Sequence, residues 1–293
     1  MAKSKSIKLI AKSSPAQVGD GFFIRRPMPS GAIRLGAMSP FLLLDHAGPT
    51  VFEPSSKPRG VDEHPHRGFE TVTIVYQGEL EHRDSNGGQG KISSGDVQWM
   101  TAGAGVVHEE KHSDAFTQAG GTLEMIQLWV NLPAKDKMTT PRYQEIQTDT
   151  IPVVEVGNGS RVRVIAGDFL ENKGAAKTHS ELSLLDIRVK EGDEIKIDLR
   201  EGSNAAVYVL SGGIILADGQ SANESEIALF SQEGSELTFT AKEDTKVLLM
   251  TGQPLNEPIA SYGPFVMNRA EEIQQAISDF HTGKMGSLKA TFS

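Results

Sequence analysis

The sequence predicts an all-β protein made of two barrels in tandem, followed by one amphipathic helix. Three observations predict this. Short apolar runs rich in Val, Ile, Leu and Thr alternate with polar residues from Phe22 to Met267, and turn-forming residues interrupt them about every eight to twelve positions. A weak internal repeat relates the two halves of the chain. Near the C-terminus, the hydrophobic period changes from two residues to the period of a helix.

Two of the interruptions have the residues of tight hairpin turns. Asn86-Gly87 and Asn158-Gly159 each separate two apolar runs, and both residues of such a pair tolerate a positive φ angle. Many short strands at regular spacing favour a sandwich or a barrel, in which closure or double-sheet packing protects the sheet edges.

The internal repeat indicates that a barrel has been duplicated. The segment VTIVYQGELEHRD, which begins at Val72, aligns with AVYVLSGGIILAD, which begins at Ala206, so that Gly78 falls on Gly212. The following segments, KISSGDVQWM and ESEIALF, align in the same order. Similarity at about half the chain length is expected of a duplicated domain, and chance similarity between two apolar hairpins is the alternative.

The chain is expected to divide after residue 133. The strand that contains IQLWVN ends at Pro133, and the polar residues after it have the character of an interdomain connection. We therefore expect an N-terminal domain over residues 1–133 and a C-terminal domain over residues 134–293. The second domain should end in a helix with Asn268 as its N-cap, Glu271 three residues later, and apolar residues that pack onto a barrel: Ile273, Ala276, Ile277 and Phe280.

Composition excludes several kinds of site. The 293 residues carry a formal net charge of -9 and include no cysteine. Disulfides, thiolate nucleophiles and sulfur-ligated zinc are therefore excluded, and any metal must bind nitrogen and oxygen. The negative charge argues against a broad nucleic-acid-binding surface. No apolar run has the length of a signal-peptide core or a membrane span. We expect a cytoplasmic protein that contacts neither nucleic acid nor membrane.

Histidine is concentrated in the first half of the chain, where six of the eight residues lie. His64 and His66 are two positions apart, so in a strand both side chains point to one face, about 6.5 to 7 Å apart along the chain. His108 and Glu110 have the same spacing, and Glu109 between them should point to the opposite face. Three imidazoles and one carboxylate are therefore expected to converge in the first barrel.

Such a ligand set would leave two positions open on an octahedral ion, for water or for a substrate. Imidazole and carboxylate ligands with open positions favour Fe(II), and Mn, Ni, Cu and Zn also fit this chemistry. Glycines at tight-turn spacing between the two ligand pairs would let a small barrel bring distant strands together; they are Gly78, Gly95, Gly103 and Gly105.

The segments EHPHRGFETVTIVYQGELEHRD and GDVQWMTAGAGVVHEE resemble the signature of the pirin family, within the cupin superfamily. QLWVNLP, YVLSGG and the tail GQPLNEPIASYGPFVMN also resemble pirin sequences, so the resemblance covers nearly the whole chain. It implies two cupin (jelly-roll) β-barrels with one metal ion in the N-terminal barrel. It also implies that the ligands are His64, His66, His108 and Glu110.

Other candidate residues in the first half have two interpretations each. The general cupin pattern, H-x-H followed after three residues by Glu, would make Glu70 a ligand, whereas the resemblance to pirins favours Glu110. His82 and His112 either line the pocket and orient a ligand imidazole, or face solvent.

The second half offers no comparable ligand set. The alignment of the two halves places Asp198 and Arg200 on the positions of His64 and His66, so we expect no metal in the second barrel. His179, at the start of an apolar strand, is expected to be a structural histidine.

The family resemblance implies a dioxygenase similar to quercetin 2,3-dioxygenase. A flavonol would bind the metal through its 3-hydroxyl group, and oxygen would attack the activated ring. Glu110 would be the catalytic residue, both as a ligand and as the base that takes the hydroxyl proton. The alternatives are an enzyme for another phenolic or enolic compound, and an iron-binding, redox-sensing regulator that binds a protein partner. A monomer is expected.

Overall fold

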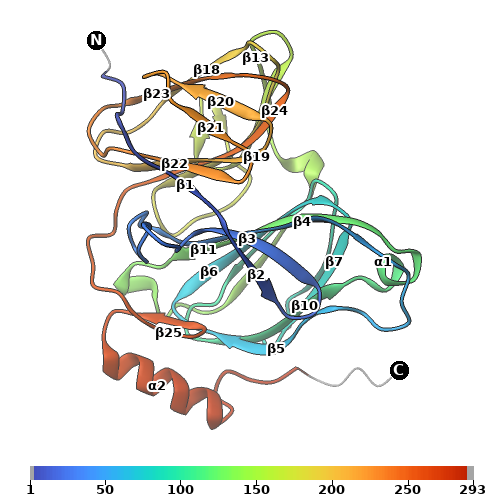
Figure 1. The fold of residues 1–293 in the computed structure, drawn as a ribbon. Helices are drawn as coiled ribbons and strands as arrows, with labels where there is room; N and C mark the ends of the chain where they lie inside the picture. Colours follow the sequence, from blue (N-terminus) through green and yellow to red (C-terminus); the bar gives the residue numbers. More distant parts are fainter. Residues whose placement is uncertain (1–2, 289–293) are drawn as a thin grey trace. The chain divides into compact units, whose positions relative to one another are not determined.

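The computed structural model describes residues 3–288 and confirms the all-β prediction, with 55% of the chain in strands and 8% in helices. The chain forms two compact units, which we call the first and the second barrel (Figure 1). The first barrel consists of residues 15–24, 43–148 and 256–288, and the second of residues 3–14, 25–42 and 149–255. The N-terminal residues 3–14 therefore belong to the second barrel, and the C-terminal residues 256–288 belong to the first. This differs from the single division expected after residue 133.

The first barrel is built mainly from antiparallel strands of the N-terminal half. Its strands are β2 (Ser14–Val18), β3 (Phe22–Met28), β4 (Phe41–Phe52), β5 (Gly60–His66), β6 (Phe69–Gln77), β7 (Glu79–Asp84), β8 (Gln89–Ser93), β9 (Val97–Thr101), β10 (Val106–His112), β11 (Gly121–Asn131) and β12 (Arg142–Ile146). They form a seven-stranded sheet in the order β12-β9-β6-β11-β4-β3-β2 and a four-stranded sheet in the order β5-β10-β7-β8. The short helices in this region are α1 (Asp114–Ala119) and two 3-10 turns, Ala134–Asp136 and Thr148–Thr150.

The second barrel has the same arrangement of sheets. Its strands are β1 (Ile7–Lys12), β13 (Val153–Val156), β14 (Ser160–Ala166), β17 (Leu182–Val189), β18 (Glu194–Asp198), β19 (Asn204–Ser211), β20 (Gly213–Leu216), β21 (Ser221–Asn223), β22 (Glu226–Phe230), β23 (Glu236–Ala241) and β24 (Thr245–Gly252). The sheet orders are β1-β22-β19-β24-β17-β14-β13 and β18-β23-β20-β21. A small hairpin of β15 (Asp168–Phe169) and β16 (Asn172–Lys173) precedes β17.

The equal strand orders confirm the duplication that the repeat predicted. Hairpin β6-β7 corresponds to β19-β20, and Gly78 and Gly212 form equivalent turns with φ angles of 86° and 80°. A side chain at Gly212 would bring its Cβ to 2.5 Å from Thr245 Oγ1, so this turn requires glycine. The strand orders also show why the N-terminal segment belongs to the second barrel. There, β1 occupies the edge position of the seven-stranded sheet that β12 occupies in the first barrel.

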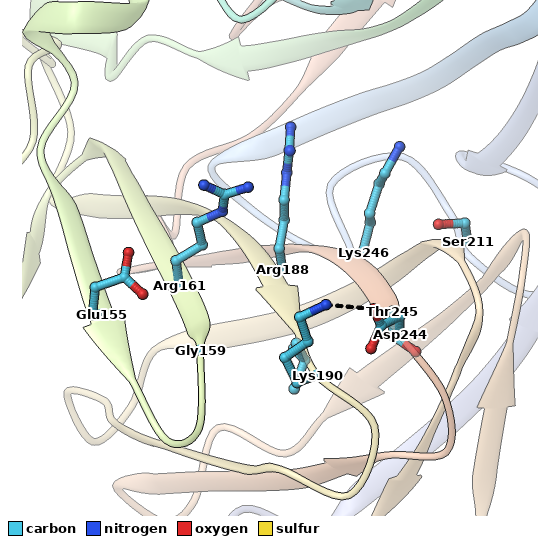
Figure 2. A pocket seen from close by; sticks show the side chains of 10 residues that line it. Glu155, Gly159, Arg161, Arg188, Lys190, Ser211, Asp244, Thr245 and Lys246 are labelled. Carbon is cyan, nitrogen blue, oxygen red and sulfur yellow. Dashed lines mark hydrogen bonds and ion pairs between the residues drawn. The ribbon is translucent and has the colours of Figure 1, made fainter.

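Alternation along the strands gives the second barrel a charged face and an apolar face. On the charged face, Arg161 pairs in register with Arg188, and Arg188 pairs with Lys246 on the next strand (Figure 2). This row borders a pocket of about 240 Å³, in which Lys190 and Asp244 form an ion pair of 2.6 Å. The cations come together only through strand pairing, so the negative charge of the whole sequence gave no sign of this local basic pocket.

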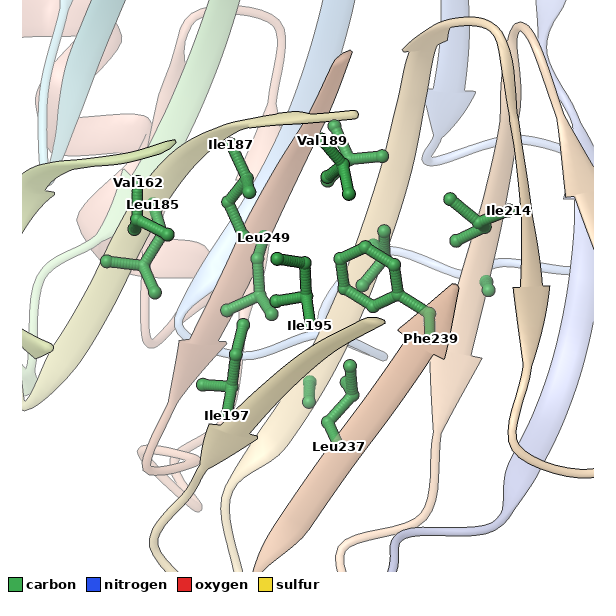
Figure 3. Packing of buried hydrophobic residues seen from close by; sticks show 14 of the residues in the cluster. Val162, Leu185, Ile187, Val189, Ile195, Ile197, Ile214, Leu237, Phe239 and Leu249 are labelled. Atoms are coloured by element: carbon green, nitrogen blue, oxygen red, sulfur yellow. The ribbon is translucent and has the colours of Figure 1, made fainter. Parts of the chain in front are cut away.

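The opposite face of the same sheet is the packed core of the second barrel (Figure 3). Apolar side chains of β14, β17 and β24 meet those of β18 and β23 across the barrel; they include Val162, Leu185, Ile187, Ile195, Ile197, Leu237, Phe239 and Leu249. Each is less than a tenth exposed, so the interior of this barrel is apolar.

The C-terminal helix α2 (Ala270–His281) packs, as predicted, onto a barrel, but the barrel is the first one. It contacts β25 (Ala260–Tyr262) and β26 (Phe265–Met267). Ile273 and Ala276 are buried against Val107 and other apolar residues. The predicted N-cap, Asn268, is wrong by one residue: the helix begins at Ala270, so Arg269 is the cap. Glu272 accepts hydrogen bonds from the backbone N–H groups of both Asn268 and Arg269. Between residues 3 and 288, no helix is long and apolar enough to cross a membrane.

Candidate metal centre

Two paired strands of the first barrel carry the candidate ligands. β5 runs antiparallel to β10, and His64 lies opposite His108 in the register. A bulge follows His108, and Glu110 then lies opposite His82 of β7 on the other side of β10. The ring centroids of His64 and His66 are 4.3 and 4.8 Å from that of His108. Strand pairing therefore brings three imidazoles together from two distant parts of the sequence.

Each of the three imidazoles is held through its Nδ1 atom. His64 Nδ1 lies 2.7 Å from the carbonyl oxygen of Asp62, and His66 Nδ1 lies 3.4 Å from the carbonyl oxygen of Pro264. His108 Nδ1 faces a further imidazole, described below. A neutral ring that donates through Nδ1 has its lone pair on Nε2. These contacts therefore leave the three Nε2 atoms available to one ion.

The positions of the Nε2 atoms fit a bound metal ion. His64 Nε2 and His66 Nε2 are 3.1 Å apart, and two ligands at right angles with bonds of about 2.1 Å would be about 3.0 Å apart. His108 Nε2 is buried and has no hydrogen-bond partner within residues 3–288. A buried polar atom without a partner is unfavourable unless an ion or another ligand satisfies it. One donor atom of each histidine lies within 4.8 Å of the other two.

Burial favours the neutral form of these imidazoles. It lowers the pKa of both His66 and His108 well below the usual value of 6.5, and each neighbouring imidazole would add repulsion if protonated. Neutral imidazole is the form that binds metals.

Glu110 supplies a buried carboxylate next to His108. Its Oε1 accepts hydrogen bonds from Thr73 Oγ1 at 3.1 Å and Gln98 Nε2 at 2.9 Å, and its Oε2 accepts one from Gln127 Nε2 at 2.7 Å. These contacts fix the position of the carboxylate inside the barrel. Glu109, as the alternation predicts, points to the other face, where it pairs with Arg83.

The four expected ligands form two overlapping groups, not one. His64, His66 and His108 form the first group, and Glu110 forms the second together with His108 and His82. Glu70, the alternative carboxylate, belongs to neither group among the described residues. It is fully buried in β6 and accepts a hydrogen bond of 2.7 Å from Thr101 Oγ1.

His82 supports the candidate ligand His108. The sequence alone left open whether His82 orients a ligand imidazole or faces solvent. The two Nδ1 atoms are 3.3 Å apart, and His82 Nε2 lies 3.1 Å from Asp84 Oδ2. The His82 ring also stacks on Tyr143, with centroids 4.9 Å apart. A carboxylate, an imidazole and a ligand imidazole in sequence are typical of the support around metal sites. His112 does not join the site, because it packs in an aromatic cluster with Phe52.

We expect His82→Phe to weaken divalent-metal binding by about 10- to 100-fold while preserving the fold. Phenylalanine keeps the stacking on Tyr143 but removes the contact with His108 Nδ1. Calorimetric titration with Ni(II) under identical buffers measures the difference. His112→Phe changes a buried histidine on β10 outside both groups and should keep the wild-type affinity. Equal affinities for wild type and His82→Phe would refute this supporting role.

The C-terminal segment holds the strand that ends at His66. The backbone of Arg67 exchanges hydrogen bonds with Pro264 and Val266, and its guanidinium bonds Asp279 of α2 at 2.9 Å. The Pro264 carbonyl is also the partner of His66 Nδ1. Sequence reasoning missed this support because it assigned the tail to the second domain. Local periodicity gives no sign of which barrel a helix will contact.

Asp279 gives this anchor a pH dependence. Hydrogen bonds from Lys284 first, and also from Arg67 and Gln275, lower the pKa of Asp279 to about 2. The unfolded chain therefore binds the proton at higher pH, and the stability from this carboxylate is lost as pH falls from about 4 to about 2. We expect the difference in melting temperature between wild type and Asp279→Asn to be constant above pH 4 and to shrink below it. A constant difference down to pH 2.5 would contradict this.

The second barrel lacks a corresponding group. Asp198 and Arg200 are exposed, and Arg200 forms an ion pair with Glu181. Both groups of candidate ligands found within residues 3–288 lie in the first barrel.

Comparisons with known proteins cover nearly the whole chain. The sequence profile described as Pirin matches residues 22–130, and the profile described as Pirin C-terminal cupin domain matches residues 184–286. A Pseudomonas aeruginosa protein, provisionally named as a quercetin 2,3-dioxygenase, is 50% identical over 91% of this chain and 93% of its own length. The mouse protein named pirin is 36% identical over 98% of this chain and 96% of its own length.

Solved structures agree with the sequence comparisons. A crystal structure titled quercetin 2,3-dioxygenase from Acinetobacter baumannii is 48% identical and superposes with a TM-score of 0.94. The match covers 98% of this chain and 100% of that one. Two family profiles and relatives that align along nearly their full length lead to one conclusion: this chain is a member of the pirin family, with two cupin domains.

Proposed function

We propose that the protein is a metal-dependent dioxygenase of the quercetin 2,3-dioxygenase type, which acts on flavonols or similar enolic or phenolic compounds. The observation that carries the proposal is the convergence of three imidazoles, two of them buried, next to the Glu110 carboxylate. The names of the Pseudomonas and Acinetobacter relatives support the same reaction. We propose His64, His66, His108 and Glu110 as the ligands of one divalent ion, with Fe(II) as the resident metal.

The bound ion would act as a Lewis acid that lowers the pKa of a coordinated substrate hydroxyl. Glu110 is the residue that can accept the proton from this hydroxyl, at a carboxylate oxygen. Gln98 and Gln127 hold the carboxylate in place, and after proton transfer their amide groups can still bond its oxygens. The protein thus supplies an oriented base inside a barrel that is largely closed to water.

The exposure of the four proposed ligands indicates the direction from which a substrate would enter. His66, His108 and Glu110 are at most 4% exposed, whereas His64 is partly exposed. A planar substrate would therefore approach past His64.

We expect Glu110→Ala to abolish oxygen uptake with quercetin, by at least about 100-fold, because it removes the proposed base and one proposed ligand. The measurement uses an oxygen electrode and protein that has been loaded anaerobically with Fe(II), with its iron content determined. Glu109→Ala is the matched control, since this neighbour points to the opposite face and should leave uptake unchanged.

Three outcomes separate the candidate functions. Uptake that disappears in Glu110→Ala and persists in Glu109→Ala supports the dioxygenase. Uptake that persists in Glu110→Ala contradicts the role of this residue. No uptake from wild-type protein that holds one iron would favour the regulator that binds a protein partner, and the same preparation would then be compared in its Fe(II) and Fe(III) forms for partner binding.

A further inference from the structure

We propose that the basic pocket of the second barrel binds a small dianion with a phosphate group, either free phosphate or a phosphate monoester. This pocket is the cavity of about 240 Å³ beside Arg161, Arg188 and Lys246 (Figure 2). The inference does not depend on the proposed dioxygenase activity, because every residue that lines the pocket lies in the second barrel.

Strand pairing places three cations side by side in this pocket. Arg161 of β14 lies opposite Arg188 of β17, and Arg188 lies opposite Lys246 of β24. Figure 2 shows that the three side chains extend from the same side of the sheet. Like charges directly opposite one another on one face of a sheet repel and are destabilising. An anion bound between these side chains would offset the repulsion.

The neighbouring rows of the same face carry carboxylates that balance their cations. Two residues along the strands in one direction, Arg163 bonds Asp186 at 2.8 Å. Two residues along in the other direction, Lys190 bonds Asp244 at 2.6 Å. The row between them has a cation on each of the three strands β14, β17 and β24. Its positive charge is therefore a local feature of one row and not a property of the whole face.

The two arginines of this row have donors that the protein does not use. Within residues 3–288, neither Arg161 nor Arg188 forms a hydrogen bond or an ion pair, although Glu155 lies opposite Arg161 in the register. The Nε atom of Arg188 is enclosed by protein, whereas its terminal Nη atoms remain accessible. A guanidinium group binds two oxygens of a phosphate or carboxylate through parallel hydrogen bonds. The accessible Nη atoms are therefore suited to an oxyanion.

The charge and size of the pocket specify the class of anion. Four cations and two carboxylates line it, an excess of two positive charges: Arg161, Arg188, Lys190, Lys246, Glu155 and Asp244. A phosphate monoester carries about 1.5 to 2 negative charges at pH 7. The volume is smaller than the roughly 300 Å³ at which pockets for drug-sized ligands begin, so a small anion fits best. Ser211, opposite Lys246 in the register, adds a hydroxyl donor at the edge.

The test is calorimetric titration of the full-length protein with inorganic phosphate and with phenyl phosphate, at constant ionic strength. We expect one site per chain, with an affinity that falls as the salt concentration is raised. Tighter binding of phenyl phosphate would assign the pocket to esters, and equal or tighter binding of inorganic phosphate would assign it to the free anion. Arg188→Met should weaken binding about 10- to 100-fold, the effect of losing charge-assisted hydrogen bonds.

A second variant and a matched control accompany this measurement. Arg161→Gln should weaken binding about tenfold, and because Arg161 is exposed, its replacement tests the site without endangering the fold. Lys196→Met also removes one positive charge from the second barrel, but Lys196 lies on β18 in the other sheet and pairs with Glu236. This control should keep the wild-type affinity. Without phosphate, Arg188→Met should keep or raise the melting temperature, because it relieves the repulsion within the row.

Two results would overturn the proposal. One is the absence of binding of either anion to the wild-type protein. The other is an affinity for phosphate that is the same in wild type, Arg188→Met and Arg161→Gln, as expected if the anion binds at the metal centre or only screens the surface. Oxygen uptake with quercetin should be unchanged in Arg188→Met, and its loss in Glu110→Ala would leave this proposal standing.

Discussion

Replacing His108 by alanine is expected to abolish metal binding in the first barrel and, with it, any metal-dependent turnover. His108 is the one residue shared by both groups of candidate ligands found within residues 3–288, and its Nε2 is a buried atom without a hydrogen-bond partner among those residues. Its loss would leave only the two imidazoles of β5 on one side of the site. We expect the affinity for Ni(II) or Fe(II) to fall by more than about 100-fold, beyond the effect of a supporting residue.

The measurement is the metal content after anaerobic loading and desalting, by elemental analysis. His281→Ala is the control, because this histidine is exposed at the end of α2 and should retain one ion per chain. Tryptophan fluorescence verifies folding of the first barrel, since both tryptophans of the chain, Trp99 and Trp129, lie there. A folded His108→Ala protein that retains one ion would show that the ligands have been assigned wrongly.

Lys137→Met is expected to lower the free energy of unfolding of the first barrel by about 3 kcal/mol. The Lys137 side chain is fully buried, and its Nζ donates to Gly68 O, Asn131 Oδ1 and Val266 O at 2.7 to 2.8 Å. Burial lowers the pKa of Lys137 to about 8, so at pH 7 the ammonium is the main form and each of its three N–H groups has an acceptor. Methionine fills a similar volume but leaves three buried acceptors unsatisfied.

Urea unfolding followed by tryptophan fluorescence reports this loss for the first barrel alone. Lys135→Met is the matched control, because Lys135 is exposed on the same short turn and should change stability by less than about 0.5 kcal/mol. The Lys137 contacts join the turn after His66 to β26, so the variant should also weaken metal binding. An unfolding midpoint equal to that of Lys135→Met would refute the structural role.

Much of the first barrel was predictable because strand alternation records which side chains share a face. The spacing of His64 and His66, and of His108 and Glu110, predicted that the two side chains of each pair share a face, and in the structure the members of each pair lie close together. The tight turns at Gly78 and Gly212 and the repeat around them predicted the duplication. These features depend on residues near one another in sequence, or on similarity between two segments.

Features that depend on distant pairing were not predictable in this way. Nothing in the residues of β1 indicates that it completes the second barrel beside β22, and nothing in α2 indicates that it supports His66. The role of His82 depends on the opposite strand, β10, which brings His108 to its Nδ1.

The most direct test of the metal centre is a crystal structure of the Fe(II)-loaded protein with anomalous diffraction data at the iron edge. We predict one strong peak in the first barrel, within bonding distance of the Nε2 atoms of His64, His66 and His108 and of a Glu110 oxygen, and none in the second barrel. A peak bound by Glu70 in place of Glu110, or iron in the second barrel, would contradict the account.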